Sequence, residues 1–260
     1  MLETGASQTR LTNNTTDDVS PASSPDGTLV VFSSDRDDPN QATCEATHAC
    51  QYELYTMNAT DGTNQTNVSN DVPFNDASPD WQSVTSLVSV VDFAYVPSTI
   101  KGSLGGTIMF DFFGPSDHTV TDNSGMGLFD SGIKVKDSFF LYTFRFSGQF
   151  PIVCTIHPTQ MTGNVKVPMN VTPPSGTVTT VFTISWATAT QSMQSPYRYD
   201  VQILRPGSGS FVPWKTGVTQ RKGTFTPDAG TGQYLFQARI RNTGNGFSSV
   251  YSAPRAITVS

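Results

Sequence analysis

Two histidines, one cysteine and one methionine stand out in the middle of the chain because of their types and their spacing. His118 comes first, and Cys154, His157 and Met161 follow about 36 residues later within one short stretch. Thiolate and thioether select copper, imidazole binds copper in both oxidation states, and two His with one Cys and a weak axial Met are the ligands of electron-transfer copper sites. A cysteine at a strand end would put three ligands on one loop and leave the fourth, His118, to a neighbouring strand. The four residues therefore predict a site for one copper ion.

Each of these residues also has an ordinary interpretation. Taken alone, His118 is a loop histidine, Cys154 a buried structural thiol beside apolar residues, and Met161 a part of the core. The combination and its spacing, rather than any one residue, favour the metal site.

The segments that would position these residues alternate between apolar and polar side chains, as strands with one buried face do. They are Val88–Phe93, Thr107–Phe112, Phe139–Phe146 and Gly163–Val167. We expect them to be the strands of a β-sandwich.

This region resembles the plastocyanin-like cupredoxins over residues of about 86 to 168, roughly a third of the chain. The similarity extends beyond the four candidate ligands to the segments Asp117–Val120, Leu128–Gly132, Phe146–Pro151 and Met161–Gly163. It implies a Greek-key sandwich holding a type 1 (blue) copper.

The resemblance also implies a role for each ligand: His118 and His157 bind copper through imidazole, Cys154 as thiolate, and Met161 as the long axial ligand. The chain departs from the family at the residue before the cysteine, which is commonly aromatic and is Val153 here.

The resemblance further implies that the edge of His157 reaches the surface through an apolar patch. Pro158, Met126 and the loop Gly125–Gly127 are available for this patch, and electrons would leave there. A metal-bound imidazole usually donates its second N–H to a carboxylate or a carbonyl, so Asp117 or a backbone group is expected to orient His118.

Cys44 and Cys50 lie in a polar loop rich in Thr and Ala, and differ in setting from Cys154. Such short-range pairs most often form a disulfide in an oxidising compartment. Two alternatives are a pair of reduced thiols and a metal site with His48, although structural zinc needs a fourth ligand that the nearby sequence does not supply.

Residues 1–83 combine short apolar runs with turn signals. The string from Ser24 to Asp37, followed by Glu53–Asn58 and Asp61–Asn64, resembles one blade of a TolB-type β-propeller, with the two cysteines in an insertion. One blade cannot close a ring, so the rest of the chain, another copy, or the remainder of a longer protein must cover it. A homo-oligomer formed through the open blade edge is one possibility.

Residues 171–260 follow a linker-like stretch and again show sandwich spacing. With an early Trp186, Tyr234 at the start of a late strand and Val250–Pro254 near the end, this block resembles a fibronectin type III domain. The predicted architecture is therefore all-β in three parts, 1–83, 84–170 and 171–260.

Composition excludes several classes of function. The net charge of −6 gives no footprint for a phosphate backbone, so nucleic acid is not an expected partner, and the sequence has no apolar run long enough for a membrane span. Five aspartates could be considered for calcium, but they lack the spacing of a calcium loop and are better interpreted as solvated turn residues: Asp17, Asp18, Asp35, Asp37 and Asp38.

The histidine count argues against an enzyme. Only three histidines are present, and two are assigned to the copper site, which leaves too few for a multicopper oxidase or a copper nitrite reductase. His48 shows no nucleophile elbow that would suggest a hydrolase.

Two hypotheses follow. The first is an extracytoplasmic type 1 copper protein, periplasmic, secreted or on the cell surface, that passes single electrons to a redox partner protein. The second is a surface binding or self-assembling structural protein in which copper is incidental or structural.

Overall fold

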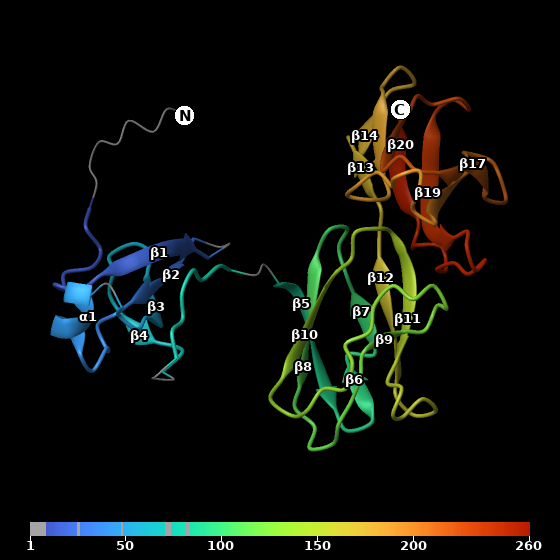
Figure 1. The fold of residues 1–260 in the computed structure, drawn as a ribbon. Coiled ribbons are helices and arrows are strands. Elements are labelled where there is room, and N and C mark those ends of the chain that lie inside the picture. Colours follow the sequence, from blue (N-terminus) through green and yellow to red (C-terminus); the bar gives the residue numbers. More distant parts are fainter. Residues whose placement is uncertain (1–8, 25–26, 48, 71–73, 82–83) are drawn as a thin grey trace. The chain divides into compact units, whose positions relative to one another are not determined.

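Strands make up nearly all of the regular structure in the computed structural model, which describes residues 9–24, 27–47, 49–70, 74–81 and 84–260 (Figure 1). The chain divides into two compact units, residues 1–83 and 84–260. The prediction of an all-β fold is confirmed. The further division at residue 170 stays a prediction.

The first unit contains one antiparallel sheet in the order β1-β2-β3-β4. Its strands are β1 (Asp18–Ser23), β2 (Leu29–Ser34), β3 (Glu53–Asn58) and β4 (Thr66–Asn67). In β3 every second side chain is buried, and Tyr55 and Met57 pack with Val30 and Phe32 of β2 in a small core. The period of two in the sequence thus becomes one buried face of the sheet.

The segment between β2 and β3 forms a short helix, α1 (Gln41–Thr47), and not the loop that the sequence predicts. Its first turn is anchored at Asn40, whose carbonyl accepts the N–H groups of Thr43 and Cys44 at 2.9 and 3.0 Å. Cys44 and Cys50 form a disulfide, with Cα atoms 4.5 Å apart, which closes the segment after the helix.

The second unit begins with two four-stranded sheets, which face each other on the two sides of a sandwich (Figure 1). One has the order β10-β8-β5-β6, with β5 (Val84–Val91), β6 (Ala94–Val96), β8 (Thr107–Phe112) and β10 (Phe139–Thr143). The other has the order β7-β12-β11-β9, with β7 (Thr99–Lys101), β9 (Thr121–Asp122), β11 (Gly148–Val153) and β12 (Thr162–Val167). Large side chains from both sheets, including Phe110, Phe112 and Phe150, are fully buried between them.

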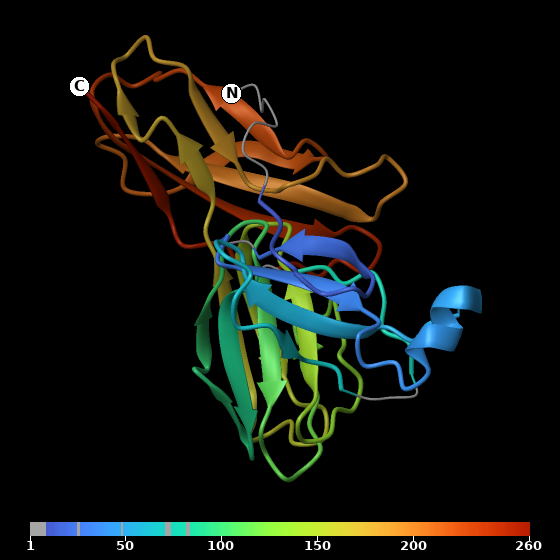
Figure 2. The same ribbon diagram turned by 90° about the vertical axis from the view of Figure 1, so that its left-hand side faces the viewer.

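Two further sheets follow, and Figure 2 shows them stacked on one another. The smaller has the order β13-β15-β18, with β13 (Asn170–Thr172), β15 (Phe182–Ser185) and β18 (Lys222–Phe225). The larger has the order β14-β20-β19-β16-β17, with β14 (Ser175–Gly176), β16 (Tyr197–Leu204), β17 (Val212–Val218), β19 (Gly232–Asn242) and β20 (Arg255–Val259). Trp186, Tyr199, Tyr234 and Phe236 fill the space between the sheets.

The two halves of the second unit share one continuous core. β-bridges join Phe146 to Ala187 and Gln149 to Val250, just before and just inside β11. The predicted strand over residues 139–146 stops at Thr143. Phe144 hydrogen-bonds to Gly105 and Gly106, and from Arg145 on the backbone pairs with the C-terminal half. These contacts involve the start of β11, whereas Cys154 follows its end.

Candidate metal centre

The backbone brings the four predicted ligands to one end of the sandwich. His118 lies beyond the end of β8, where its N–H and C=O exchange hydrogen bonds with Lys134 at 3.0 and 2.8 Å. Cys154, His157 and Met161 occupy the turn between β11 and β12. The Cys154 N–H donates to the Met161 carbonyl at 3.0 Å and the Met161 N–H to the His157 carbonyl at 3.0 Å, so the turn is closed on itself.

Both imidazoles direct Nδ1 toward the sulfur of Cys154. The Sγ atom lies 3.8 Å from Nδ1 of His118 and 3.6 Å from Nδ1 of His157, and the three donor atoms all lie within 4.8 Å of one another. A trigonal ion with bonds of about 2.0 Å to nitrogen and about 2.3 Å to sulfur would hold nitrogen and sulfur about 3.7 Å apart. The two sulfur–nitrogen distances thus match those expected around one first-row metal ion.

Burial differs among the four residues in a way that matters for their chemistry. His118, Cys154 and Met161 are completely buried at 0% exposure, whereas His157 is only half-buried. Ile156 and Pro158 on either side of His157 are exposed, and the half-exposed Phe93 contacts its ring. His157 is therefore the candidate ligand that solvent or a partner can approach, through an apolar surface.

Thr119 links the two ligand segments. Its backbone N–H points at the Cys154 sulfur, 3.3 Å away, and its side-chain oxygen accepts the N–H of Thr155 at 2.8 Å. Its carbonyl accepts the hydroxyl of the buried Tyr95 at 2.6 Å. Burial, and to a lesser extent the negative charge available at Cys154, raises the pKa of the Tyr95 phenol, so that this hydroxyl remains a donor.

The group that contacts the second nitrogen of His118 is Asp92, and the expectation that Asp117 would do so is wrong. Oδ1 of Asp92 lies 3.2 Å from Nε2 of His118 and also accepts the N–H of Ser116 at 3.2 Å. Desolvation acts to raise the pKa of the Asp92 carboxyl, but the bonds from His118 and Ser116 outweigh it and hold the pKa below its ordinary value. The exposed Asp117 follows Ser116 directly.

Met126 and its glycine loop do not lie beside His157. The loop is the tip of a hairpin that begins at Thr121 next to the site and leads away from it. Met126 is buried, and its carbonyl accepts hydrogen bonds from Tyr197 and Asn242 of the C-terminal half at 3.2 and 3.5 Å. The predicted contribution of this loop to an apolar exit patch is wrong, because the C-terminal half covers it.

The other candidate metal-binding groups do not support a second site. His48 lies outside the described residues. Asp35, Cys44 and Cys50 approach one another, but the two sulfurs are joined in the disulfide and cannot also bind an ion. Asp35 is completely buried, with its Oδ1 atom accepting the N–H of Asp17 at 2.9 Å, so its interpretation as a solvated turn residue is wrong.

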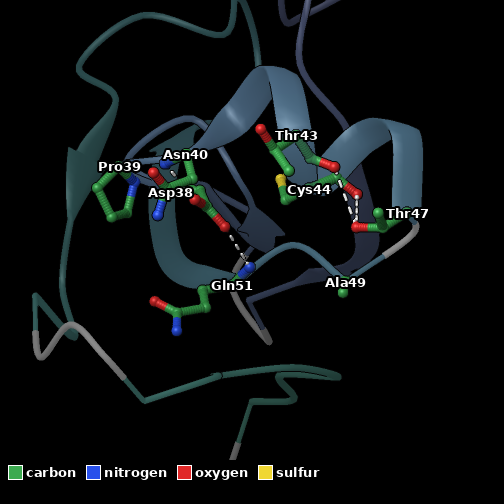
Figure 3. A pocket seen from close by; sticks show the side chains of 8 residues that line it. All are labelled: Asp38, Pro39, Asn40, Thr43, Cys44, Thr47, Ala49 and Gln51. Atoms are coloured by element: carbon green, nitrogen blue, oxygen red, sulfur yellow. Dashed lines mark hydrogen bonds between the residues drawn. The ribbon is translucent and has the colours of Figure 1, made fainter.

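A pocket of about 210 Å³ lies beside the helix of the first unit (Figure 3). Asp38 on its wall is already engaged, because its carboxylate accepts the backbone N–H groups of Asn40 and Gln51 at 2.7 and 2.8 Å. The other lining residues are Pro39, Thr43, Cys44, Thr47 and Ala49, which offer no general base or nucleophile.

In the part of the chain that the structure describes, no helix has the length and apolarity that crossing a membrane requires.

No protein-family model matches the sequence, and no curated protein matches it either. Among solved structures, a novel purple cupredoxin from Nitrosopumilus maritimus is 20% identical, with a TM-score of 0.30, over 32% of this chain and 98% of that chain. The reduced form of an amicyanin variant is 21% identical, with a TM-score of 0.31, over 34% of this chain and 84% of that chain. The oxidised form of another amicyanin variant is 20% identical, with a TM-score of 0.30, over 33% and 81% of the two chains. The protein is all-β.

Proposed function

We propose that this protein is an extracytoplasmic type 1 copper protein that transfers single electrons and is not an enzyme. His118, Cys154 and His157 bind the copper, and Met161 is its axial ligand. The observation that carries the proposal is the separation of Cys154 Sγ from the two Nδ1 atoms, 3.8 and 3.6 Å, in a site where the sulfur is fully buried. Copper bound there would supply a one-electron couple.

The chain's own groups support this chemistry. The Thr119 N–H is directed at the sulfur and, as a hydrogen-bond donor, fixes its position. His118, Cys154 and Met161 are fully buried, so the candidate site is closed to bulk water on their side. A redox partner protein would dock on the apolar surface around half-buried His157, and an electron would pass through this imidazole.

The parts of the chain on either side of the candidate copper domain would serve in attachment or in docking of a partner. We assign residues 1–83 to a partial TolB-type propeller repeat and 171–260 to a fibronectin type III-like domain. The hydroxyl of Tyr234 donates to the Gly230 carbonyl at 2.8 Å, which is the arrangement of the tyrosine corner in such sandwiches. The disulfide of Cys44 and Cys50 supports a location outside the cytoplasm.

The experiment that tests the proposal is the visible spectrum of the purified protein after addition of Cu(II), recorded in parallel for Cys154→Ser. We expect an intense thiolate-to-copper charge-transfer band in the parent and none in the variant. The double variant Cys44→Ser/Cys50→Ser is the matched control and should keep the band. Folded, copper-loaded parent protein without the band would remove the electron-transfer function.

A second candidate function is self-assembly of the first unit. Within the described residues, β1 and β4 each pair on one side only, and such edges are templates for another strand. Light scattering on the copper-free protein tests this candidate. Assemblies that persist in Cys154→Ser would favour a structural role in which copper is incidental.

A further inference from the structure

One two-residue turn contacts both candidate imidazole ligands. Asp92 and Phe93 connect β5 to β6, and their side chains diverge toward different histidines. Asp92 contacts His118, and Phe93 contacts His157. The turn is 26 positions from the first histidine, and the resemblance to cupredoxins assigns it no role.

The contact between Asp92 and His118 is enclosed on the His118 side, whereas the Asp92 side chain is 34% exposed. The side chain of His118 is 1% exposed, so Asp92 is the group that meets the hydrogen-bonding need of its Nε2 atom at 3.2 Å. Gly114 makes this approach possible. A Cβ atom at that position would lie 2.6 Å from Asp92 Oδ1 and 3.2 Å from His118 Nε2.

Phe93 holds an unfavourable backbone conformation beside His157. Its φ of 61° is in the left-handed region, which is a clear outlier for a bulky residue. Its ring stands edge-on to the His157 imidazole at a centroid distance of 4.8 Å and an interplanar angle of 82°. It is also 48% exposed, so core packing alone does not account for an aromatic residue there.

We propose that the Asp92–Phe93 turn is the positioning element of the metal centre. The carboxylate of Asp92 holds His118 with its proton on Nε2 and its lone pair on Nδ1, and the ring of Phe93 fixes the plane of the exposed His157 imidazole. This inference rests on the proposed function for its consequence in electron transfer, but the positions of the two rings are properties of the metal-free protein as well.

The carboxylate has an electrostatic effect besides its steric one. A negative charge on the far side of the His118 ring makes Nδ1 a stronger donor and stabilises a more highly charged metal. Cu(II) is therefore favoured over Cu(I), and the reduction potential is lower than the same ligands would give without Asp92. A tenfold change in the ratio of the two affinities corresponds to about 59 mV for a one-electron couple.

The test of Asp92 compares Asp92→Asn, which keeps a neutral acceptor, with Asp92→Ala, which removes it. Asp117→Asn is the matched control, because it deletes the same charge beside His118 without touching the ring. We expect Asp92→Ala to weaken Cu(II) binding about 10- to 100-fold and to raise the midpoint potential, Asp92→Asn to do so less, and Asp117→Asn to do neither. Equal shifts in Asp92→Ala and Asp117→Asn would overturn the proposal, because the charge alone would then explain them.

A measurement without copper separates this inference from the proposed function. Nitrogen NMR of the copper-free full chain should show His118 as a single tautomer protonated at Nε2 in the parent and a tautomer mixture in Asp92→Ala. If Asp92→Ala does not fold, Gly114→Ala serves instead, because it pushes the two groups apart and keeps both. A parent whose His118 is protonated at Nδ1 would refute the inference even if copper binds.

The test of Phe93 uses Phe93→Leu, with Phe93→Tyr as the conservative variant that should restore the parental behaviour. We expect broader His157 side-chain resonances in the copper-free Phe93→Leu protein, because the imidazole loses its edge contact. In the copper form, the same variant should broaden the distribution of electron paramagnetic resonance parameters. Resonances that are identical in Phe93→Leu and the parent would show that the ring does not position His157.

Discussion

The backbone N–H of Thr119 points at the sulfur of Cys154 across 3.3 Å, and the side-chain oxygen of the same residue accepts the N–H of Thr155 at 2.8 Å. One residue on the His118 segment thus holds both the sulfur and the backbone that follows it. The two ligand segments are joined before any metal binds.

Thr119→Val tests this link in the copper-free protein. The variant keeps the shape of the side chain but leaves the Thr155 N–H without its acceptor, so we expect unfolding to become easier by about 1 kcal/mol. Denaturant unfolding measures the change. Thr119→Ser retains the oxygen and should recover most of the loss, and equal losses in both variants would point to the methyl group instead.

Met161→Leu tests the axial ligand. Since Met161 is fully buried, leucine should preserve the packing while removing the thioether, so the charge-transfer band should persist and the reduction potential should rise. Spectroscopy and redox titration measure both. Met169→Leu is the matched control at another fully buried methionine. Identical potentials in the two variants would make Met161 a core residue only.

Asp200 supplies a prediction about acid stability. Burial acts to raise its pKa, but hydrogen bonds from Arg241, the Gly217 N–H and Arg239 lower it below the ordinary value. A carboxyl with a lowered pKa in the folded state stabilises the fold above its unfolded pKa of about 3.9, and this stabilisation is lost as the pH falls through the folded value.

We therefore expect Asp200→Asn to destabilise the protein by about 2 kcal/mol near neutral pH and by progressively less below about pH 4. Thermal unfolding at several pH values measures this. Asp228→Asn removes a more exposed partner of Arg205 and should have a smaller effect. A difference in stability between the parent and Asp200→Asn that stayed constant down to pH 2 would refute the lowered pKa of Asp200.

Gly125→Ala tests the junction between the two halves of the second unit. Gly125 has a φ of +79°, and a Cβ there would lie 2.8 Å from the ring of Phe247. We expect a loss of about 1–3 kcal/mol in the free energy of unfolding, measured with denaturant. Gly127→Ala also has a positive φ but nothing within 4 Å, so it reports the backbone part alone. Equal losses of stability in Gly125→Ala and Gly127→Ala would show that the Phe247 ring moves aside and that the contact adds no cost.

Local sequence was enough to predict the span of β8, since the expected strand Thr107–Phe112 has the same bounds in the structure. It also predicted three candidate ligands in one short stretch, Cys154, His157 and Met161, and in the structure these residues share one turn. The spacing also predicted His118, 36 positions away, as the fourth ligand, and the Nδ1 atom of His118 lies 3.8 Å from the sulfur.

The residues that the sequence did not reveal depend on distant pairing. Asp92 reaches His118 only because the turn after β5 comes to the same end of the sandwich as the segment after β8. The sequence around Asp92 contains no feature that distinguishes it from the other aspartates. Asp117 is adjacent in sequence, but neighbouring side chains of an extended chain point to opposite sides. Met126 was misplaced for a similar reason, since a hairpin directs its tip away from its base.

The junction at the start of β11 has a consequence for how the protein could be attached. From Gly148 to Val153 the strand spans about 20 Å. Cys154 follows its C-terminal end, whereas the C-terminal half of the unit pairs with Gln149 near its N-terminal end. Anything anchored through those sheets would be separated from the sulfur by the length of the sandwich. The fold thus places the candidate metal centre and the C-terminal sheets at opposite ends of β11, so a tether attached to those sheets could be exchanged or lengthened without contact with Cys154.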